Sequence, residues 1–183
     1  LTPSIITDNN VSKLRKLLSL RSFLEREIVA LKNRIKNSIK ESGIEFVLKL
    51  ERDMLESKNK YLKELESEIK KLIKSDVDMN KMDQLIQSIK GVGPITSWNF
   101  IATTNKFNYF ENARQFACYI GVAPFEKSSG SSIKGKTQTD RRSNRKLNAI
   151  ITMAARSAAL YNPEIKEQMV RKLKEGKHYN CVL

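Results

Sequence analysis

Large apolar side chains recur at steps of three and four positions over the first forty residues, and this spacing constrains the fold more than any other feature. Residues three and four apart lie on one face of an α-helix, so the pattern predicts a helix over residues 11–40 with one apolar stripe. Gly43 interrupts the pattern. The stripe consists of Leu17, Leu20, Leu24, Ile28, Leu31, Ile35 and Ile39.

A second stripe begins at Ile44 and predicts another long helix, with Glu, Lys and Arg at its outer positions. A stripe this narrow needs a partner helix. The sequence leaves two pairings open: an antiparallel hairpin within the chain that folds back at Gly43, or a coiled-coil arm that joins subunits. Residues 1–75 are therefore predicted to form a coiled-coil-like helical arm. The heptad columns of this second stripe hold Leu48, Leu55, Leu62, Ile69, Leu65 and Leu72.

The charge and the rare residues narrow the classes of function. The net charge of +14 favours phosphate-bearing partners. His178 is the only histidine, which argues against His-based metal sites and Ser-His-Asp hydrolysis within this chain. Cys118 and Cys181 are too few for a disulfide framework or a zinc module, and fit a reducing compartment. The longest uncharged run, residues 91–105, is too short to span a bilayer. Because the first methionine is Met54, we expect a fragment of a longer protein.

Two glycines and a proline follow a short predicted helix over residues 83–89. Gly91 and Gly93 permit a tight turn, and Pro94 suits the first position of the next helix. This pattern is typical of a helix-hairpin-helix, whose exposed helix N-terminus can direct backbone N–H groups at a phosphate. An ordinary connection in which Gly91 only caps a helix fits the turn equally well. The net positive charge favours contact with DNA.

Three further helices are predicted downstream. One opens at Glu111 or Asn112 and ends at Gly121, one covers residues 147–160 and is buried, and one runs from Asn162-Pro163 to about Lys174. Aromatic and apolar residues at helical spacing in this region are expected to form a core rather than a stacking platform. They are Trp98, Phe100, Ile101, Phe107, Phe110, Phe116, Tyr119 and Ile120.

A basic serine- and glycine-containing segment, residues 124–146, is predicted to be a loop. From Lys127 to Lys146 it holds seven Lys or Arg and one acid, Asp140. Such a segment cannot build a core, but it can wrap a polyanion. A serine hydroxyl is a weak nucleophile that needs a base, a metal or stabilising cations. Arg141, Arg142 and Arg145 could hold a phosphodiester during serine attack on phosphorus; a loop that only contacts phosphate is the simpler alternative.

The order of several motifs resembles the C-terminal transposase domain of the IS-one-ten (IS116/IS902-like) insertion-sequence family. The similarity covers residues 76–178, and the two preceding helices resemble the coiled-coil connector of that family. The matching motifs run over Gln87–Thr96, Phe110–Pro124, Ser128-Ser129-Gly130, Gly135-Lys136-Thr137, Asn144, Leu147, Ala154-Ala155 and Tyr161-Asn162-Pro163.

The resemblance implies a bacterial, cytoplasmic recombinase that moves a mobile element through a covalent serine–DNA intermediate with a bridge RNA as guide. It places the nucleophile at Ser129, with Ser128 as the second choice. It also implies an N-terminal RuvC-like domain whose four acids hold Mg²⁺, and nothing in this chain matches that domain. Asp76, Asp78 and Asp83 are interpreted as linker and helix-start acids, so no cofactor is expected here and the chain alone should be inert.

The chain departs from the family pattern at two positions. Ser143 stands where family members often carry glycine, and Asn148 stands where an arginine is frequent. The residues available for phosphate contact therefore differ from the family pattern at these positions, where Arg145 and Lys146 could substitute.

The sequence as a whole predicts an all-α protein, with the arm over residues 1–75 and the transposase domain over residues 76–183. The predicted function is that of a DNA transposase fragment, forming a homo-oligomer through the arm. The alternative is a non-catalytic nucleic-acid-binding or oligomerisation module. The predicted nucleic-acid-binding residues are Gly91, Gly93, Lys127, Lys134, Lys136, Arg141, Arg142, Arg145 and Lys146.

Overall fold

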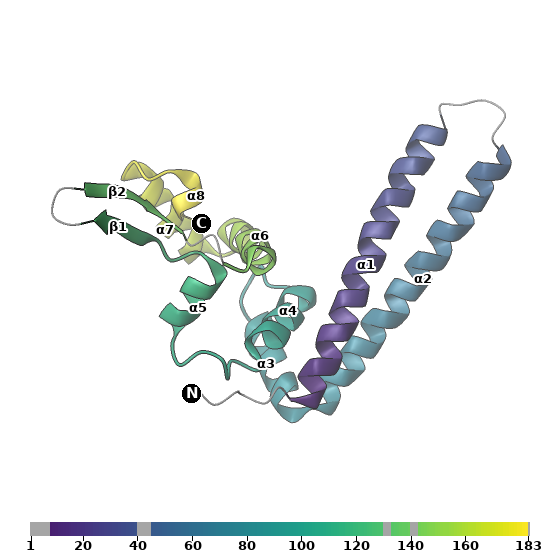
Figure 1. Cartoon of the computed structure of the whole chain (residues 1–183), viewed down its shortest axis with the longest axis horizontal. Helices are drawn as coiled ribbons and strands as arrows, with labels where there is room; N and C mark the ends of the chain where they lie inside the picture. The colour runs from purple at the N-terminus through teal and green to yellow at the C-terminus, as the bar shows by residue number, and fades with distance from the viewer. Residues whose placement is uncertain (1–7, 40–44, 130–132, 140–142, 183) are drawn as a thin grey trace. The chain divides into compact units, whose positions relative to one another are not determined.

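The computed structural model describes residues 8–39, 45–129, 133–139 and 143–182 (Figure 1). The chain divides into two compact units, Thr7–Asn80 and Lys81–Leu183. Their boundary lies within helix α3 (Val77–Gln87). In the described part of the chain, no helix combines the length and the apolar character needed to cross a membrane.

The first unit is an arm of two long helices, α1 (Asn9–Ser38) and α2 (Glu45–Ser75), that pack side by side (Figure 1). Asp8 caps α1, since its Oδ1 accepts a hydrogen bond from the backbone N–H of Asn10 at 2.8 Å. The arm therefore contains both predicted helices, and α1 and α2 are each other's partner within the chain. The turn at Gly43 lies outside the described residues. Buried apolar side chains on the two helices are Val11, Leu14, Leu18, Ile28, Leu31, Leu65, Ile69 and Ile73.

Ion pairs that cross between the two helices show that the arm is antiparallel. Arg21 contacts Glu66 at 2.8 Å, Lys58 contacts Glu27, and Arg34 contacts Glu51 at 3.1 Å. As the residue number rises along α1, the number of its partner on α2 falls. The last two pairs are separated by one heptad on each helix, so they repeat on the same side of the arm. The hairpin within the chain, one of the two pairings left open by the sequence, is the one observed.

The second unit is built around α6 (Arg145–Tyr161), which contacts α4 (Pro94–Thr104), α5 (Ala113–Ile120) and α7 (Pro163–Lys174). A short helix, α8 (Tyr179–Val182), packs on α7. These bounds agree closely with the predicted helices, although α6 is only partly buried, with Met153 and Leu160 exposed.

The cap residues explain the agreement. Asn112 accepts a hydrogen bond from the N–H of Gln115 at 2.9 Å, and Asn162 accepts one from the N–H of Glu164 at 3.0 Å. Gly121 ends α5 in the left-handed conformation, φ 75°. Asp76 accepts from the N–H of Met79 at 3.0 Å and begins α3, as a helix-start acid does.

The predicted aromatic core is only partly buried. Trp98, Ile101 and Ile120 are buried, whereas Phe107 and Tyr119 are exposed by 36% and 40%. The ring of Phe116 lies between those of Phe100, Phe107 and Phe110, with centroid distances of 5.3–5.9 Å. These rings therefore pack on one another beside α5.

One predicted loop contains a β-hairpin, which corrects the loop assignment for residues 124–146 and adds two short strands to the predicted all-α fold. Strands β1 (Phe125–Ser129) and β2 (Ile133–Gln138) pair antiparallel, with a register irregularity between Phe125 and Lys127 (Figure 1). Lysines, serines and glycine interrupt the apolar alternation that marks a half-buried strand, so periodicity alone could not reveal these strands. Helices dominate the rest of the described chain, as predicted.

Candidate functional site

The two candidate serines are consecutive residues at the end of β1. Ser129 is the last residue of the strand and pairs with Ile133, while Ser128 pairs with Lys134 and Lys127 pairs with Gly135. The predicted basic residues Lys127, on β1, and Lys134 and Lys136, on β2, therefore lie on the two paired strands of one hairpin. Arg141, Arg142 and Gly130 lie outside the described residues.

Both ends of the hairpin segment meet at the junction between α5 and α6. The backbone N–H of Asn144 donates to the carbonyl oxygen of Tyr119 at 2.9 Å, and Asn144 Nδ2 donates to Tyr119 Oη at 3.2 Å. Asn148 Nδ2 donates to the carbonyl oxygens of Ile120 at 2.9 Å and Gly121 at 3.4 Å. We name this group of contacts between residues 119–121 and 143–148 the base junction. Sequence reasoning did not find it, because its partners lie at least 22 residues apart.

Gly121 and Ser143 fit together at the base junction. A Cβ atom added at Gly121 would lie 2.4 Å from Ser143 Oγ, so the serine side chain occupies the space beside the glycine. Asn148 also turns toward this junction through its hydrogen bonds. The two positions where the chain departs from the family pattern thus lie together and contact protein.

Arg145 and Lys146 are exposed in the first turn of α6, which carries no acidic residue. The positive end of a helix dipole lies at this terminus, so cations there are unfavourable unless an anion approaches. Asn144 Oδ1 caps the helix by accepting from the N–H of Leu147 at 3.0 Å. These two predicted nucleic-acid-binding residues therefore lie at the base junction, where the hairpin segment joins α6.

The two glycines of the turn between α3 and α4 have different surroundings. Gly91 has φ 95°, and a Cβ atom there would lie 2.5 Å from the backbone nitrogen of Ala158 in α6. Its conformation and its close contact with α6 explain this glycine without a ligand. Gly93, the N-cap residue of α4, has no atom within 4 Å of an added Cβ and makes no side-chain cap. An approaching phosphate would find Gly93 more accessible than Gly91.

Sequence reasoning overlooked a second basic group at the end of α7. Arg171, Lys172, Lys174 and Lys177 lie within four positions of Glu175 in the sequence. The hydrogen bond from Lys172, together with the charges of Lys172, Lys177 and Arg171, holds the pKa of the Glu175 carboxyl below its usual value. From Lys81 to Leu183 there are seventeen Lys or Arg and seven Asp or Glu. Most of the chain's net charge therefore belongs to the second unit.

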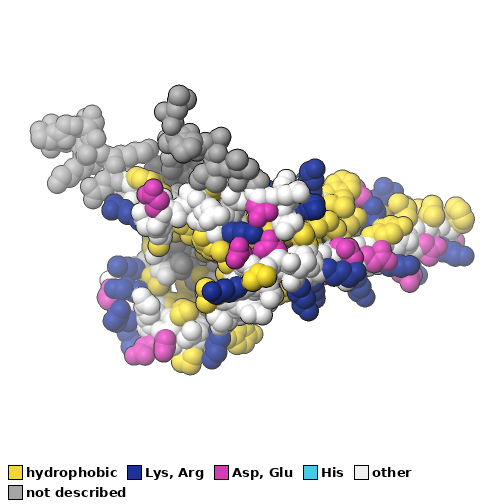
Figure 2. Space-filling model, turned by 90° about the horizontal axis from the view of Figure 1, so that it is seen from below, with side chains coloured by type: hydrophobic (Ala, Val, Ile, Leu, Met, Phe, Trp, Pro, Cys, Tyr) yellow, Lys and Arg dark blue, Asp and Glu magenta, His cyan; other side chains and the backbone are white. Residues whose placement is uncertain are grey.

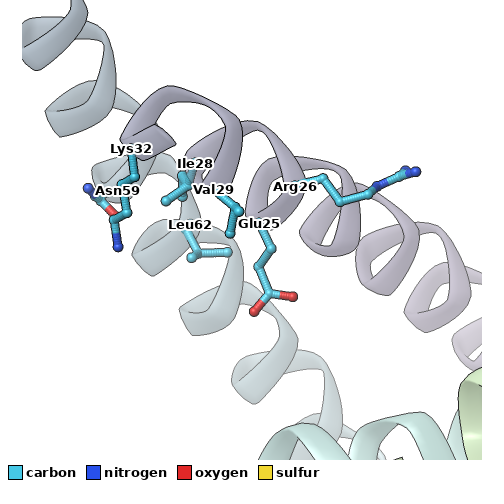
Figure 3. A pocket seen from close by; sticks show the side chains of 7 residues that line it. All are labelled: Glu25, Arg26, Ile28, Val29, Lys32, Asn59 and Leu62. Carbon is cyan, nitrogen blue, oxygen red and sulfur yellow. The ribbon is translucent and has the colours of Figure 1, made fainter. Parts of the chain in front are cut away.

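The arm carries an open groove between its helices (Figure 3). It is lined by Glu25, Arg26, Ile28, Val29, Lys32, Asn59 and Leu62. This lining mixes apolar side chains with charges of both signs and includes no nucleophile, so we assign it no chemistry.

Among the described residues, no group of three or more His, Cys, Asp or Glu side chains could hold a metal ion.

Comparison with protein families finds a match within the second unit. The profile described as the Transposase IS116/IS110/IS902 family matches residues 83–170, from α3 to α7. Residues 83–170 form a transposase domain of this family. The transposase domain therefore includes the β1–β2 hairpin, the base junction and the Gly91–Gly93 turn.

Curated relatives agree with this assignment. The chain is 25% identical over 115 residues to the "Insertion element IS116 uncharacterized 44.8 kDa protein" of Streptomyces clavuligerus, covering 63% of this chain and 28% of that protein. It is 29% identical over 119 residues to the "Insertion element IS110 uncharacterized 43.6 kDa protein" of Streptomyces coelicolor, covering 65% and 28%. It is 35% identical over 66 residues to the "Transposase for insertion sequence element IS1111A" of Coxiella burnetii, covering 36% and 17%. The chain thus spans less than a third of the length of these relatives.

Proposed function

We propose that this chain is part of an insertion-sequence transposase, in which the transposase domain binds DNA and supplies the hydroxyl of Ser129 as the nucleophile for strand cleavage and transfer. The family of residues 83–170 is the observation that carries the proposal. The position of Ser129 at the end of a strand, with Lys134 and Lys136 on the paired strand, supports it. The surplus of Lys and Arg in the second unit provides attraction for the phosphate backbone.

In the proposed reaction, Ser129 Oγ attacks a phosphorus atom of the DNA backbone. A new Oγ–P bond forms while the bond from phosphorus to one sugar oxygen breaks, and a base outside this chain accepts the serine proton. Arg145 and Lys146, with Arg141 and Arg142, would stabilise the additional negative charge on the phosphoryl oxygens. The resulting phosphoserine ester keeps the energy of the phosphodiester, so a second DNA hydroxyl can displace the serine without ATP.

The reaction as proposed needs partners beyond this chain. These are a RuvC-like domain, whose own acidic residues would hold Mg²⁺, and a bridge RNA that selects the DNA. We further propose that the arm joins two copies of the chain. Val47, Leu50, Met54 and Tyr61 are all exposed, and their spacing places them on one face of α2. The part of Figure 2 that shows the arm carries a band of hydrophobic side chains next to charged ones.

Replacing Ser129 by alanine tests the nucleophile. With the RuvC-like domain, RNA and Mg²⁺ supplied, Ser129→Ala should abolish the covalent protein–DNA adduct on a denaturing gel, while DNA binding stays within about twofold. Ser128→Ala is the matched control, because it changes the adjacent serine on the same strand. An adduct that survives in Ser129→Ala and disappears in Ser128→Ala would move the nucleophile by one residue.

A non-catalytic role in nucleic-acid binding is the second candidate. The basic group at the end of α7 favours it, since this group lies outside the serine segment and beyond the last residue of the family match. If both serine variants keep the adduct at the parent level, the binding role becomes the better explanation.

A further inference from the structure

We propose that Asn144 and Asn148 are positioning residues that fix the β1–β2 hairpin at its base and thereby aim Ser129. This inference rests on the proposed function for the part that concerns Ser129. The first reason is the weakness of the hairpin itself. Strands of five and six residues pair only with each other in the described chain, and an isolated two-stranded hairpin is marginally stable in water.

The second reason is the geometry of the base junction. The hydrogen bond from the N–H of Asn144 to the carbonyl oxygen of Tyr119 joins the two ends of the segment that contains the hairpin. Asn148 Nδ2 donates to the carbonyl oxygens of Ile120 and Gly121, which are at the C-terminal end of α5 and have no helical partner of their own. The junction therefore holds the residues before β1 against the helix after β2.

The third reason separates positioning from ordinary helix capping. Asn144 uses Oδ1 to cap α6 and uses Nδ2 to contact Tyr119 Oη, so its two functions depend on different atoms. Asn148 lies inside α6 and caps nothing, yet its side chain reaches back 27 and 28 residues. Neither long-range contact is needed to form α6 itself. Their common effect is to hold α5 and the first turns of α6 together.

Three variants remove the long-range contacts with little change to α6. Asn148→Ala deletes the donor and leaves a good helix former. Asn144→Ser keeps an oxygen that can cap the helix but removes the amide group that donates to Tyr119, and Tyr119→Phe removes the other side of the same bond. The matched control is Asn99→Ala, because Asn99 Nδ2 donates only to the carbonyl oxygen of Ile95 one turn earlier in α4.

Hydrogen exchange of the full chain provides the first test. Backbone amides of residues 125–129 and 133–138 should exchange about fivefold faster in Asn148→Ala, the ratio expected for one lost hydrogen bond. Asn144→Ser and Tyr119→Phe should raise the exchange equally, because they break the same bond, and Asn99→Ala should leave it unchanged. Hairpin exchange in Asn148→Ala that equals the parent, or that rises no more than exchange throughout α6, would overturn the proposal.

The second test measures how well Ser129 is positioned for reaction rather than how stable the hairpin is. In the complete recombinase, Asn148→Ala should reduce the amount of covalent adduct per bound DNA about fivefold or more, with binding unchanged. Adduct formation at the parent level despite faster hairpin exchange would contradict the positioning role. A parent protein that forms no adduct at all would contradict the proposed nucleophile instead, and hydrogen exchange would still decide whether the two asparagines hold the hairpin.

Discussion

At the residue scale, Gly91 shows how a motif glycine can serve the fold. From the sequence, a turn that presents backbone to phosphate and a simple helix connection were equally good explanations. The structure gives Gly91 a positive φ and places it against the backbone of α6, while Gly93, two residues later, has open space around it. Gly91 is therefore required by packing and backbone conformation, whereas Gly93 is not, although the two glycines belong to one sequence motif.

Replacing each glycine by serine should change the free energy of unfolding by very different amounts. Gly91→Ser should lower the free energy of unfolding by at least about 2 kcal/mol, because φ 95° strains any side chain and the helix backbone of α6 cannot move away. Gly93→Ser should stay within about 0.5 kcal/mol of the parent, since a serine there can cap α4. Urea unfolding followed by the fluorescence of Trp98 measures both. Equal losses would show that Gly91 is not packed as described.

At the element scale, α2 carries charged residues on the side that faces α1. Glu51 is buried, with one oxygen paired to Arg34 and the other, Oε2, without a hydrogen-bond partner. Lys58, one heptad later, pairs with Glu27. The apolar pattern had placed charged residues only on the outside of this helix. These polar pairs reduce the apolar contact along the arm, and they fix which residues of the two helices meet.

Removing the buried carboxylate should stabilise the arm. Glu51→Leu should raise its free energy of unfolding by about 1 kcal/mol, because an apolar side chain there no longer leaves a buried oxygen unpaired. Arg34→Ala should lower it by about 1 kcal/mol, since the carboxylate stays buried and loses its partner. Hydrogen exchange of the amides of residues 55–65 compares the two. A loss of stability in Glu51→Leu would mean that the ion pair contributes more than its burial costs.

At the scale of the whole molecule, charge and exposed apolar surface belong to different units. The second unit carries most of the positive charge, whereas the arm exposes large apolar residues along α2, among them Leu50 and Tyr61. Leu55 and Leu62, which belong to the heptad columns of the second predicted helix, are only half exposed within the hairpin of the arm. A test of association must therefore use the exposed residues, because changing Leu55 or Leu62 would also disturb the arm itself.

Polar substitution of the exposed stripe should separate the subunits. Leu50→Ser combined with Met54→Ser and Tyr61→Ser should convert an oligomer to monomer by light scattering while helical circular dichroism is retained, because exposed apolar area drives association. Arg52→Ser with Lys63→Ser is the control on exposed charged positions of the same helix. A parent protein that is already monomeric at micromolar concentration would exclude the arm as a subunit interface.

The sequence by itself determined the helices and several of their ends, because apolar spacing and cap residues such as Asn112, Asn162 and Gly121 act within a few positions of the chain. It also determined the family, through the order of its motifs. Only the tertiary structure decided that the arm folds back on itself, that the serine segment is a β-hairpin, and that Asn148 holds that hairpin at its base. Each of these depends on partners far apart in the chain, and local spacing does not specify which distant groups will meet.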